Sequence, residues 1–185
     1  MKKGFTLIEL LIVIGILAIL ATVVVLVLNP AELLRQARDS QRLSDLGSVK
    51  SAIGLYLTTV TTPTFDAGPT CTATGCSSNC PFISGTCTET SSTLVNSTGW
   101  VKIDLTQTTG GSPLSALPLD PTNAGSYFYA YKGNDTDKTF ELDCRLESIK
   151  YRDMMKSDGG DKNTCSNYTE STCFYEMGTA PGLNL

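Results

Sequence analysis

A continuous apolar run from Phe5 to Leu28 constrains the fold of this 185-residue chain more than any other feature of its sequence. Coiled as a helix at about 1.5 Å per residue, the run is about 36 Å long, enough to cross a hydrocarbon core of about 30 Å. Lys2 and Lys3 precede it, and the next basic residue is Arg35. Because basic residues favour the cytoplasmic side, we expect a single-pass membrane precursor with a cytoplasmic N-terminus and an exported C-terminal part.

Two residues at the start of the run are unusual for a membrane anchor. Gly4 is the only small residue between the lysines and the run, so cleavage after it would remove both charges and keep the apolar helix. Glu9 places an ionisable group within the run at a cost of about 2.5–3.5 kcal/mol. Cleavage would give Phe5 a free α-amino group at a matching depth. We predict that this amine pairs with Glu9 of the same or an adjacent chain and sets the axial stagger between neighbours.

Positions 2–14 read Lys-Lys-Gly-Phe-Thr-Leu-Ile-Glu-Leu-Leu-Ile-Val-Ile, which resembles the prepilin motif of type IV pilins and type II secretion pseudopilins. The short leader and the phenylalanine resemble the type IVa subclass. The resemblance implies that prepilin peptidase removes residues 1–4 after Gly4 and that Phe5 becomes N-methylated. It also assigns Glu9 to filament assembly.

The function implied by this resemblance is that of a major pilin. Such a subunit is first held in the inner membrane. The pilus assembly machinery then polymerises many copies of it into an extracellular filament, which is used in adhesion and motility. A pseudopilin or minor pilin of a secretion or DNA-uptake machine is the alternative within the same family. A signal-anchored membrane enzyme or receptor is a third function, from another class.

The composition disfavours enzymes and nucleic-acid binding. The chain has no histidine, which excludes a Ser-His-Asp triad, a Cys-His pair and every histidine-containing zinc site. We expect no enzyme and no catalytic residue. The net charge is −4, which opposes general phosphate binding. A local basic stretch is interpreted as a solvated face, so no specific nucleic acid is expected; its members are Arg145, Lys150, Arg152 and Lys156.

Helical patterning continues beyond the apolar run. Pro30 lies at the expected membrane boundary and predicts a kink. From Ala31 to Val60, apolar residues at three- and four-residue steps predict an amphipathic helix; they are Leu46, Val49, Ile53, Tyr56, Leu57 and Val60. The charge pairs Glu32/Arg35 and Asp39/Arg42 are expected on exposed faces. The predicted domains are therefore a leader at 1–4, a long helix at 5–57 with its membrane part at 5–28, and a globular headgroup at 58–185.

Three segments of the headgroup read as strands. Residues 100–105 and 127–131 are rich in β-formers, and in residues 140–147 apolar and charged residues alternate as in a half-buried strand. Turn residues at 133–135 predict a hairpin between the last two segments. The expected fold is α+β, with the long helix packed on a small antiparallel sheet and with disulfide-rich loops, which resembles a pilin headgroup.

All seven cysteines lie in the part expected to be exported, where disulfides are favoured. Cys165 and Cys173 are close in sequence and flanked by polar residues, so we expect them to form a bridge. Cys144, on the apolar side of its predicted strand, is the candidate for the unpaired thiol. The remaining four have no assigned pairing and include no CxxC pair, which disfavours zinc; they are Cys71, Cys76, Cys80 and Cys87.

Two short acidic clusters, Asp135/Asp137 and Asp158/Asp161, are similar to fragments of oxygen-ligand loops. Neither completes an EF-hand pattern, and aspartate and glycine also favour turns for conformational reasons. We expect no cofactor, and calcium stays open as the alternative at these clusters.

Overall fold

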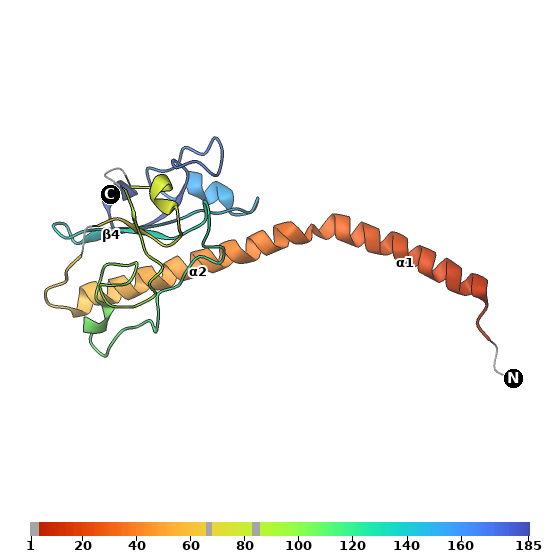
Figure 1. Ribbon diagram of the computed structural model, residues 1–185, viewed down its shortest axis with the longest axis horizontal. Coiled ribbons are helices and arrows are strands. Elements are labelled where there is room, and N and C mark those ends of the chain that lie inside the picture. Colours follow the sequence, from red (N-terminus) through yellow and green to blue (C-terminus); the bar gives the residue numbers. More distant parts are fainter. Residues whose placement is uncertain (1–3, 66–67, 83–85) are drawn as a thin grey trace. The chain divides into compact units, whose positions relative to one another are not determined.

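The computed structural model describes residues 4–65, 68–82 and 86–185, and it divides into two compact units, Met1–Arg35 and Gln36–Leu185. Most of the predicted leader, residues 1–3, lies outside the described residues. Two α-helices make up the first third of the chain: α1 at Leu7–Leu28 and α2 at Pro30–Thr59 (Figure 1).

The two helices are separated by Asn29. This residue has φ 39° and ψ 72°, in the left-handed region, where asparagine is tolerated better than most residues. Pro30 then opens α2, in a position where its missing N–H is not needed and its φ suits the helix. The sequence predicted a helix over 5–57 with a kink at Pro30. In the structure the helical region begins at Leu7 and ends at Thr59, with the break at Asn29.

One face of α2 supplies much of the domain's hydrophobic core. Its innermost side chains are completely buried and recur at three- and four-residue steps; they are Leu46, Val49, Ile53 and Tyr56. They pack in one cluster with apolar residues of the sheet and its flanks, among them Tyr129, Tyr131, Phe140, Leu142 and Cys144. The apolar stripe read from the sequence therefore marks the face of α2 that lies against the sheet.

The sheet has five strands in the order β2-β1-β3-β4-β5. Their bounds are Thr70–Cys71 for β1, Thr88–Glu89 for β2, Ala130–Asn134 for β3, Thr139–Cys144 for β4 and Tyr175–Gly178 for β5. All neighbouring pairs are antiparallel except β1 and β2, which are parallel. The predicted α+β class is confirmed, with this one parallel pair as an addition.

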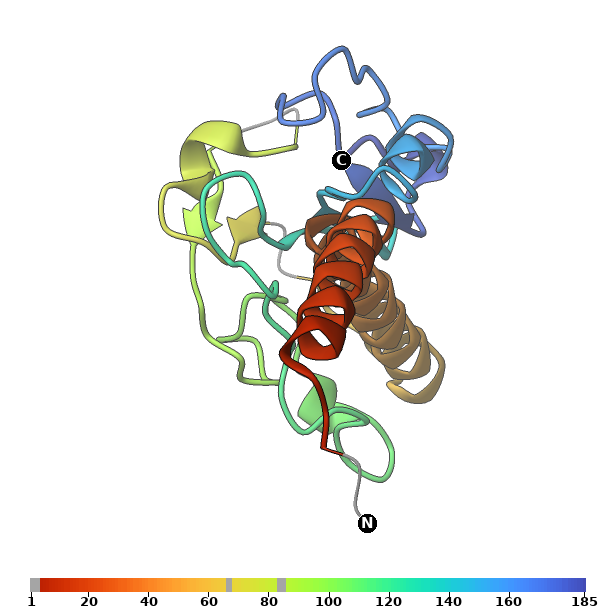
Figure 2. The ribbon, with the colours of Figure 1, turned by 90° about the vertical axis from the view of Figure 1, so that its right-hand side faces the viewer.

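Short helices and irregular loops fill the rest of the domain. The 3₁₀ helices are η1 at Cys76–Asn79, η2 at Leu105–Gln107, η3 at Arg152–Lys156 and η4 at Pro181–Leu183. In Figure 2 the segment of residues 86–115, in green, is seen apart from the C-terminal segments, in blue.

The strand predicted at residues 100–105 is wrong. This segment is irregular, and Trp100, Val101 and Ile103 are all buried, so its apolar residues do not alternate between two faces. Backbone bonds to loops hold it instead, including Trp100 N to the carbonyl of Ser92 at 3.1 Å. The strand expected from Tyr127 begins only at Ala130, and it forms the predicted hairpin with β4.

The charge pair Asp39/Arg42 is not on an exposed face, as the sequence suggested. Both side chains are fully buried. The Arg42 guanidinium donates to Asp39 at 2.8 Å, to Asp120 at 2.7 and 3.0 Å, and to Glu147 at 2.8 Å. Asp39 in turn accepts from the backbone N–H groups of Glu147 and Ser148. Three segments of the chain, α2 and the loops that contain Asp120 and Glu147, are thus joined at one buried guanidinium.

Candidate functional site

Helix α1 presents apolar side chains all around its axis, and the described ones are exposed. Its described large apolar side chains are between 45 % (Val13) and 81 % (Leu7) exposed. Among the described residues, Leu7–Thr59 is the one helical stretch whose length and apolar composition would allow it to cross a membrane. In water such a surface is strongly unfavourable, so α1 requires a lipid or a protein environment.

The N-terminus of α1 is closed by a capping box between Thr6 and Glu9. The Thr6 hydroxyl accepts a bond from the Glu9 N–H at 3.3 Å, while Glu9 Oε2 accepts from the Thr6 N–H at 2.9 Å and from its hydroxyl at 2.6 Å. Such a reciprocal pair satisfies two of the four free N–H groups at a helix start. Thr6 was not among the predicted site residues, although the spacing Thr-x-x-Glu before an apolar run is the sequence signal for a capping box.

Gly4 and Phe5 precede the helix in an exposed segment without regular secondary structure. Phe5 is 76 % exposed. A Cβ added at Gly4 would meet no atom within 4 Å, and its φ is not in the left-handed region. The fold itself therefore places no requirement on glycine at position 4.

The comparison with protein families concerns this same segment. Residues 1–25 match the family model of the prokaryotic N-terminal methylation motif. The chain has a prepilin-type N-terminus. This motif is typical of type IV pilins and pseudopilins, and proteins that carry it are generally structural and non-enzymatic. Neither a curated protein nor a solved structure matches the chain.

The cysteines of the headgroup form three disulfides. They are Cys71–Cys76, Cys80–Cys87 and Cys165–Cys173. Cys144 is a free, fully buried thiol on the core side of β4. Burial raises the pKa of this thiol well above its usual value, so it stays protonated.

The residues of the predicted basic stretch do not form a single surface. Arg145 is fully buried and donates to the backbone carbonyls of Ser126, Glu170 and Cys173. Its guanidinium lies 4.2 Å from the centre of the Phe174 ring. Desolvation lowers the pKa of Arg145 to about 10. The interpretation of this stretch as a solvated face is therefore wrong for Arg145, which is a structural residue.

The two acidic clusters differ in how fully their oxygens are bonded. In the hairpin turn, Asp135 accepts from the Phe65 N–H and from the Lys138 ammonium, both at 2.7 Å. Asp137 accepts from the Asn134 amide at 2.8 Å. The second cluster, Asp158/Asp161, lies beside carboxylates of the sheet.

Three carboxylates of the sheet were not recognised as site residues from the sequence. Glu141, Asp143 and Glu176 are buried. For Glu141 and Asp143, the alternation of residues 140–147 had predicted a solvent-exposed polar face. Carboxylate oxygens of Glu141, Glu176 and Asp161 lie within 4.8 Å of one another. The two acidic residues at alternate positions of a predicted strand were the available signal, because they had to share one face.

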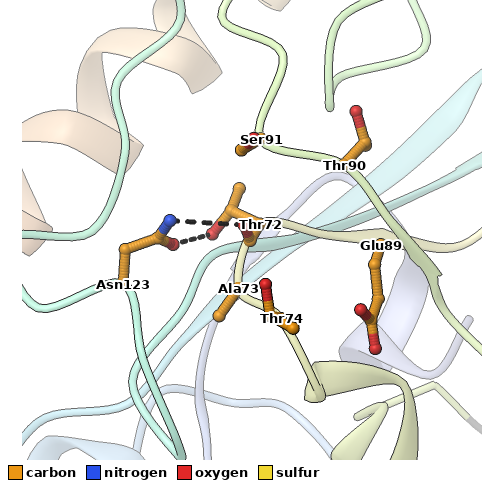
Figure 3. A pocket seen from close by; sticks show the side chains of 7 residues that line it. All are labelled: Thr72, Ala73, Thr74, Glu89, Thr90, Ser91 and Asn123. Carbon is orange, nitrogen blue, oxygen red and sulfur yellow. Dashed lines mark hydrogen bonds between the residues drawn. The ribbon is translucent and has the colours of Figure 1, made fainter.

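A separate pocket of about 400 Å³ lies beside β1 and β2 (Figure 3). Thr72 donates to the Asn123 side chain at 2.7 Å on one side of it. The Glu89 carboxylate accepts from Gly75 N–H at 2.9 Å and from the Ser77 hydroxyl at 2.8 Å. The lining of the pocket is polar apart from one alanine. It consists of Thr72, Ala73, Thr74, Glu89, Thr90, Ser91 and Asn123. None of these residues was a predicted site residue.

Proposed function

We propose that this protein is a major pilin, the structural subunit of an extracellular filament of the type IV pilus kind. The observation that carries the proposal is the apolar surface of α1, which is exposed on all sides. In a precursor, lipid would cover this surface; in a filament, the α1 helices of neighbouring copies would cover it. Prepilin peptidase and the pilus assembly machinery are the partners that this sequence of events requires.

The geometry around Glu9 supports a role in assembly. Among the described residues, the capping box uses only Oε2 of Glu9, so Oε1 keeps its capacity to accept a bond. Cleavage after Gly4 would create an ammonium group at Phe5, next to the positive end of the helix dipole, where a cation is unfavourable. A carboxylate from the same or a neighbouring chain would offset this cost, and Glu9 is the acidic residue of the first turn.

The headgroup supports a structural role because it has its own core. The compact unit Gln36–Leu185 contains the hydrophobic clusters, all three disulfides and the Arg42 network. Along the described residues, the first buried side chain is that of Asp39, and the first residue of the hydrophobic core is Leu46. The apolar side chains of α1 are thus left for contacts with lipid or with other copies.

A pseudopilin or minor pilin remains the second candidate, because the same N-terminal motif serves both classes. The Cys165–Cys173 bridge closes a loop near the C-terminus, which resembles the disulfide-closed surface region of pilins and favours the pilus subunit. Abundance distinguishes the two, since a major pilin makes up the bulk of its filament.

The test is electron microscopy and intact-mass measurement of filaments sheared from cells that express the chain. We expect filaments in which this protein is the dominant component, with a subunit that begins at Phe5 and carries one added methyl group. Filaments whose subunit retains residues 1–4 would contradict the prepilin processing. A trace amount within filaments of another subunit would assign the chain to the minor pilins.

A further inference from the structure

The pocket beside β1 and β2 opens where these two parallel strands end. Their last residues, Cys71 and Glu89, are partners in register. The chain after β1 enters η1 at Cys76, whereas the chain after β2 continues as an irregular loop. Residues 72–74 and 90–91, which follow the two strands, line the pocket. Strands that separate beyond their carboxyl ends leave a crevice between them, as in the ligand crevices of α/β sheets.

Covalent and hydrogen bonds fix two walls of this pocket. The disulfide between Cys71 and Cys76 closes the segment that contains residues 72–74. From the other wall, Glu89 Oε1 accepts from the Gly75 N–H at 2.9 Å. Gly75 has φ 79°, a conformation that glycine adopts without strain. Because the walls are fixed before a ligand enters, binding costs little conformational entropy.

Asn123 forms the third wall and is itself held by two bonds. Its side-chain oxygen accepts from the Thr72 hydroxyl at 2.7 Å, and its amide donates to the Thr72 carbonyl at 3.3 Å (Figure 3). The Thr72 hydroxyl in turn accepts from the Tyr129 N–H at 3.0 Å. A side-chain amide has two N–H groups, so one donor of Asn123 stays available at the pocket.

Other polar atoms of the lining are also available. Oε1 of Glu89 accepts from Gly75 and from the Ser77 hydroxyl, whereas Oε2 makes no bond to the described residues. The hydroxyls of Thr74 and Ser91, both exposed, likewise make no bond within the described part of the chain. The pocket thus offers one carboxylate acceptor, one amide donor and hydroxyls that serve as either.

The charge of the lining restricts the class of ligand. No lysine or arginine lines the pocket, and Glu89 is its one charged side chain. Bonds from the Ser77 hydroxyl and the Gly75 N–H lower the pKa of Glu89, so this carboxylate is ionised at neutral pH. Anionic ligands are therefore repelled. A single carboxylate is a poor site for a hard cation, and the single alanine, Ala73, gives an apolar ligand little contact.

We propose that this pocket binds one uncharged sugar unit of a glycan. Sugar hydroxyls both donate and accept, so one of them can donate to Glu89 Oε2 while another accepts from the Asn123 amide. The volume of about 400 Å³ is in the lower part of the range of about 300–1,000 Å³ found for ligand pockets, which suits a single ring. The pocket belongs to the unit Gln36–Leu185, so sugar binding does not depend on α1 or on filament formation.

The experiment titrates the ¹⁵N-labelled full chain with single sugars and records ¹H–¹⁵N correlation spectra. The micelles consist of a detergent without a sugar headgroup, because a maltoside would compete for the pocket. The panel contains glucose, galactose, mannose, N-acetylglucosamine and N-acetylgalactosamine. For at least one of them we expect saturable shifts of the Thr74 and Ser91 amides and of the Asn123 side chain. Since one ring makes few contacts, the Kd should be on the order of 1–10 mM.

Two charged sugars test the role of the carboxylate. N-acetylneuraminic acid is an anion and should bind at least several-fold more weakly than the best uncharged sugar, because Glu89 repels it. Binding of N-acetylneuraminic acid as tight as that of the uncharged sugars would contradict the proposal. Glucosamine carries an amino group that is partly charged at neutral pH. A response to glucosamine alone would show that the pocket recognises a cation, which also contradicts the proposal.

Glu89→Gln keeps the shape of the side chain and an oxygen that can accept from Gly75, but it removes the charge. We expect the Kd for the best sugar to rise roughly fivefold or more, because a bond to a charged acceptor is lost. Ser91→Ala is a second variant at an exposed position and should raise the Kd roughly two- to fivefold. Asp153→Asn is the control, because this exposed carboxylate lies on η3 and outside the lining; it should leave the Kd unchanged.

Three further results would overturn the proposal. They are the absence of shifts with every uncharged sugar up to about 50 mM, well above the expected Kd; saturable shifts confined to residues outside the pocket; and wild-type affinity in both Glu89→Gln and Ser91→Ala. Filaments formed by a chain that binds no sugar would refute this inference and leave the proposed pilin function intact.

Discussion

Single charged residues decide how the headgroup is held together. Arg42 and Asp39 are three residues apart on α2, a spacing that normally gives a weak surface pair. Here both are buried, and Arg42 bonds to Asp120 and Glu147, which lie 78 and 105 residues further along the chain than Arg42. The network therefore docks α2 to two distant loops, and its contribution depends on all members being present.

Arg42→Ala should destabilise the headgroup by about 3–5 kcal/mol, because it leaves buried carboxylates without their cation. Denaturant unfolding of the full chain in micelles measures this free energy. Arg35→Ala is the matched control: Arg35 is 50 % exposed and lies 3.7 Å from Glu32, so its loss should cost less than about 1 kcal/mol. Equal effects of the two substitutions would contradict a structural role for the buried network.

Glu9 has two roles that one substitution cannot separate. Glu9→Gln can preserve the capping box with Thr6, since glutamine also serves at this position, but it removes the charge. Glu9→Leu removes both. We expect both variants to insert into the membrane normally and both to fail in assembly, because each leaves the Phe5 ammonium without its partner. The assay is membrane fractionation together with the yield of sheared filaments.

Thr6→Ala is the complementary control, since it removes the cap and keeps the carboxylate. We expect this variant to assemble. Normal filament yield from Glu9→Gln would show that the carboxylate acts as a helix cap only.

The secondary-structure elements show where sequence patterns are informative. The stripe of α2 was predictable because its apolar residues repeat with the helix period over many turns. The hairpin of β3 and β4 was predictable because alternation and turn residues occur together. Neither signal exists for β1 and β2, which have two residues each and depend on partners far along the chain.

The errors arose where tertiary contacts overrode local patterns. Residues 100–105 look like a strand because they mix β-formers with polar residues, yet they form a buried irregular segment in which the Trp100 indole donates to Pro118 at 2.9 Å. The acidic side of β4 looked exposed because charged residues usually face water. The loop at residues 157–163 covers that side, where the N–H groups of Asp161 and Lys162 donate to Glu176. The alternation of apolar and charged residues within one strand gives no information about such a contact with another segment.

The C-terminal disulfide Cys165–Cys173 stabilises the headgroup by closing one loop. Replacement of both Cys165 and Cys173 by alanine should lower the free energy of unfolding by about 2–3 kcal/mol, because a loop of this length loses its closure in the unfolded state. Unfolding of the full chain under non-reducing conditions measures the change. Cys144→Ala, which breaks no bridge, is the control. Peptide mapping without reduction that links Cys144 to Cys165 or Cys173 would refute this pairing.

At the scale of the whole molecule, the chain consists of two parts that suit different environments, water for one and lipid or protein for the other. The unit Gln36–Leu185 contains the core, whereas α1 has an apolar surface suited to lipid or protein. A chain without residues 1–28 should therefore fold as a soluble monomer when it is made in an oxidising compartment. Its unfolding free energy should lie within about 1 kcal/mol of that of the headgroup in the full chain, since no core residue is removed.

Sedimentation and denaturant unfolding of this shortened chain provide the test. Aggregation, or a loss of several kcal/mol, would show that α1 contributes to the core of the headgroup.

Burial of Cys144 also has a kinetic consequence for the period in which the disulfides form. The thiolate is the species that attacks disulfides, and a fully buried, protonated thiol cannot do so. Before β4 and β5 pair, however, Cys144 is free to react with Cys173, which lies two residues from its eventual cross-strand neighbour Tyr175. Closure of this strand pair thus separates a period of disulfide exchange from a finished subunit whose three bridges no longer rearrange.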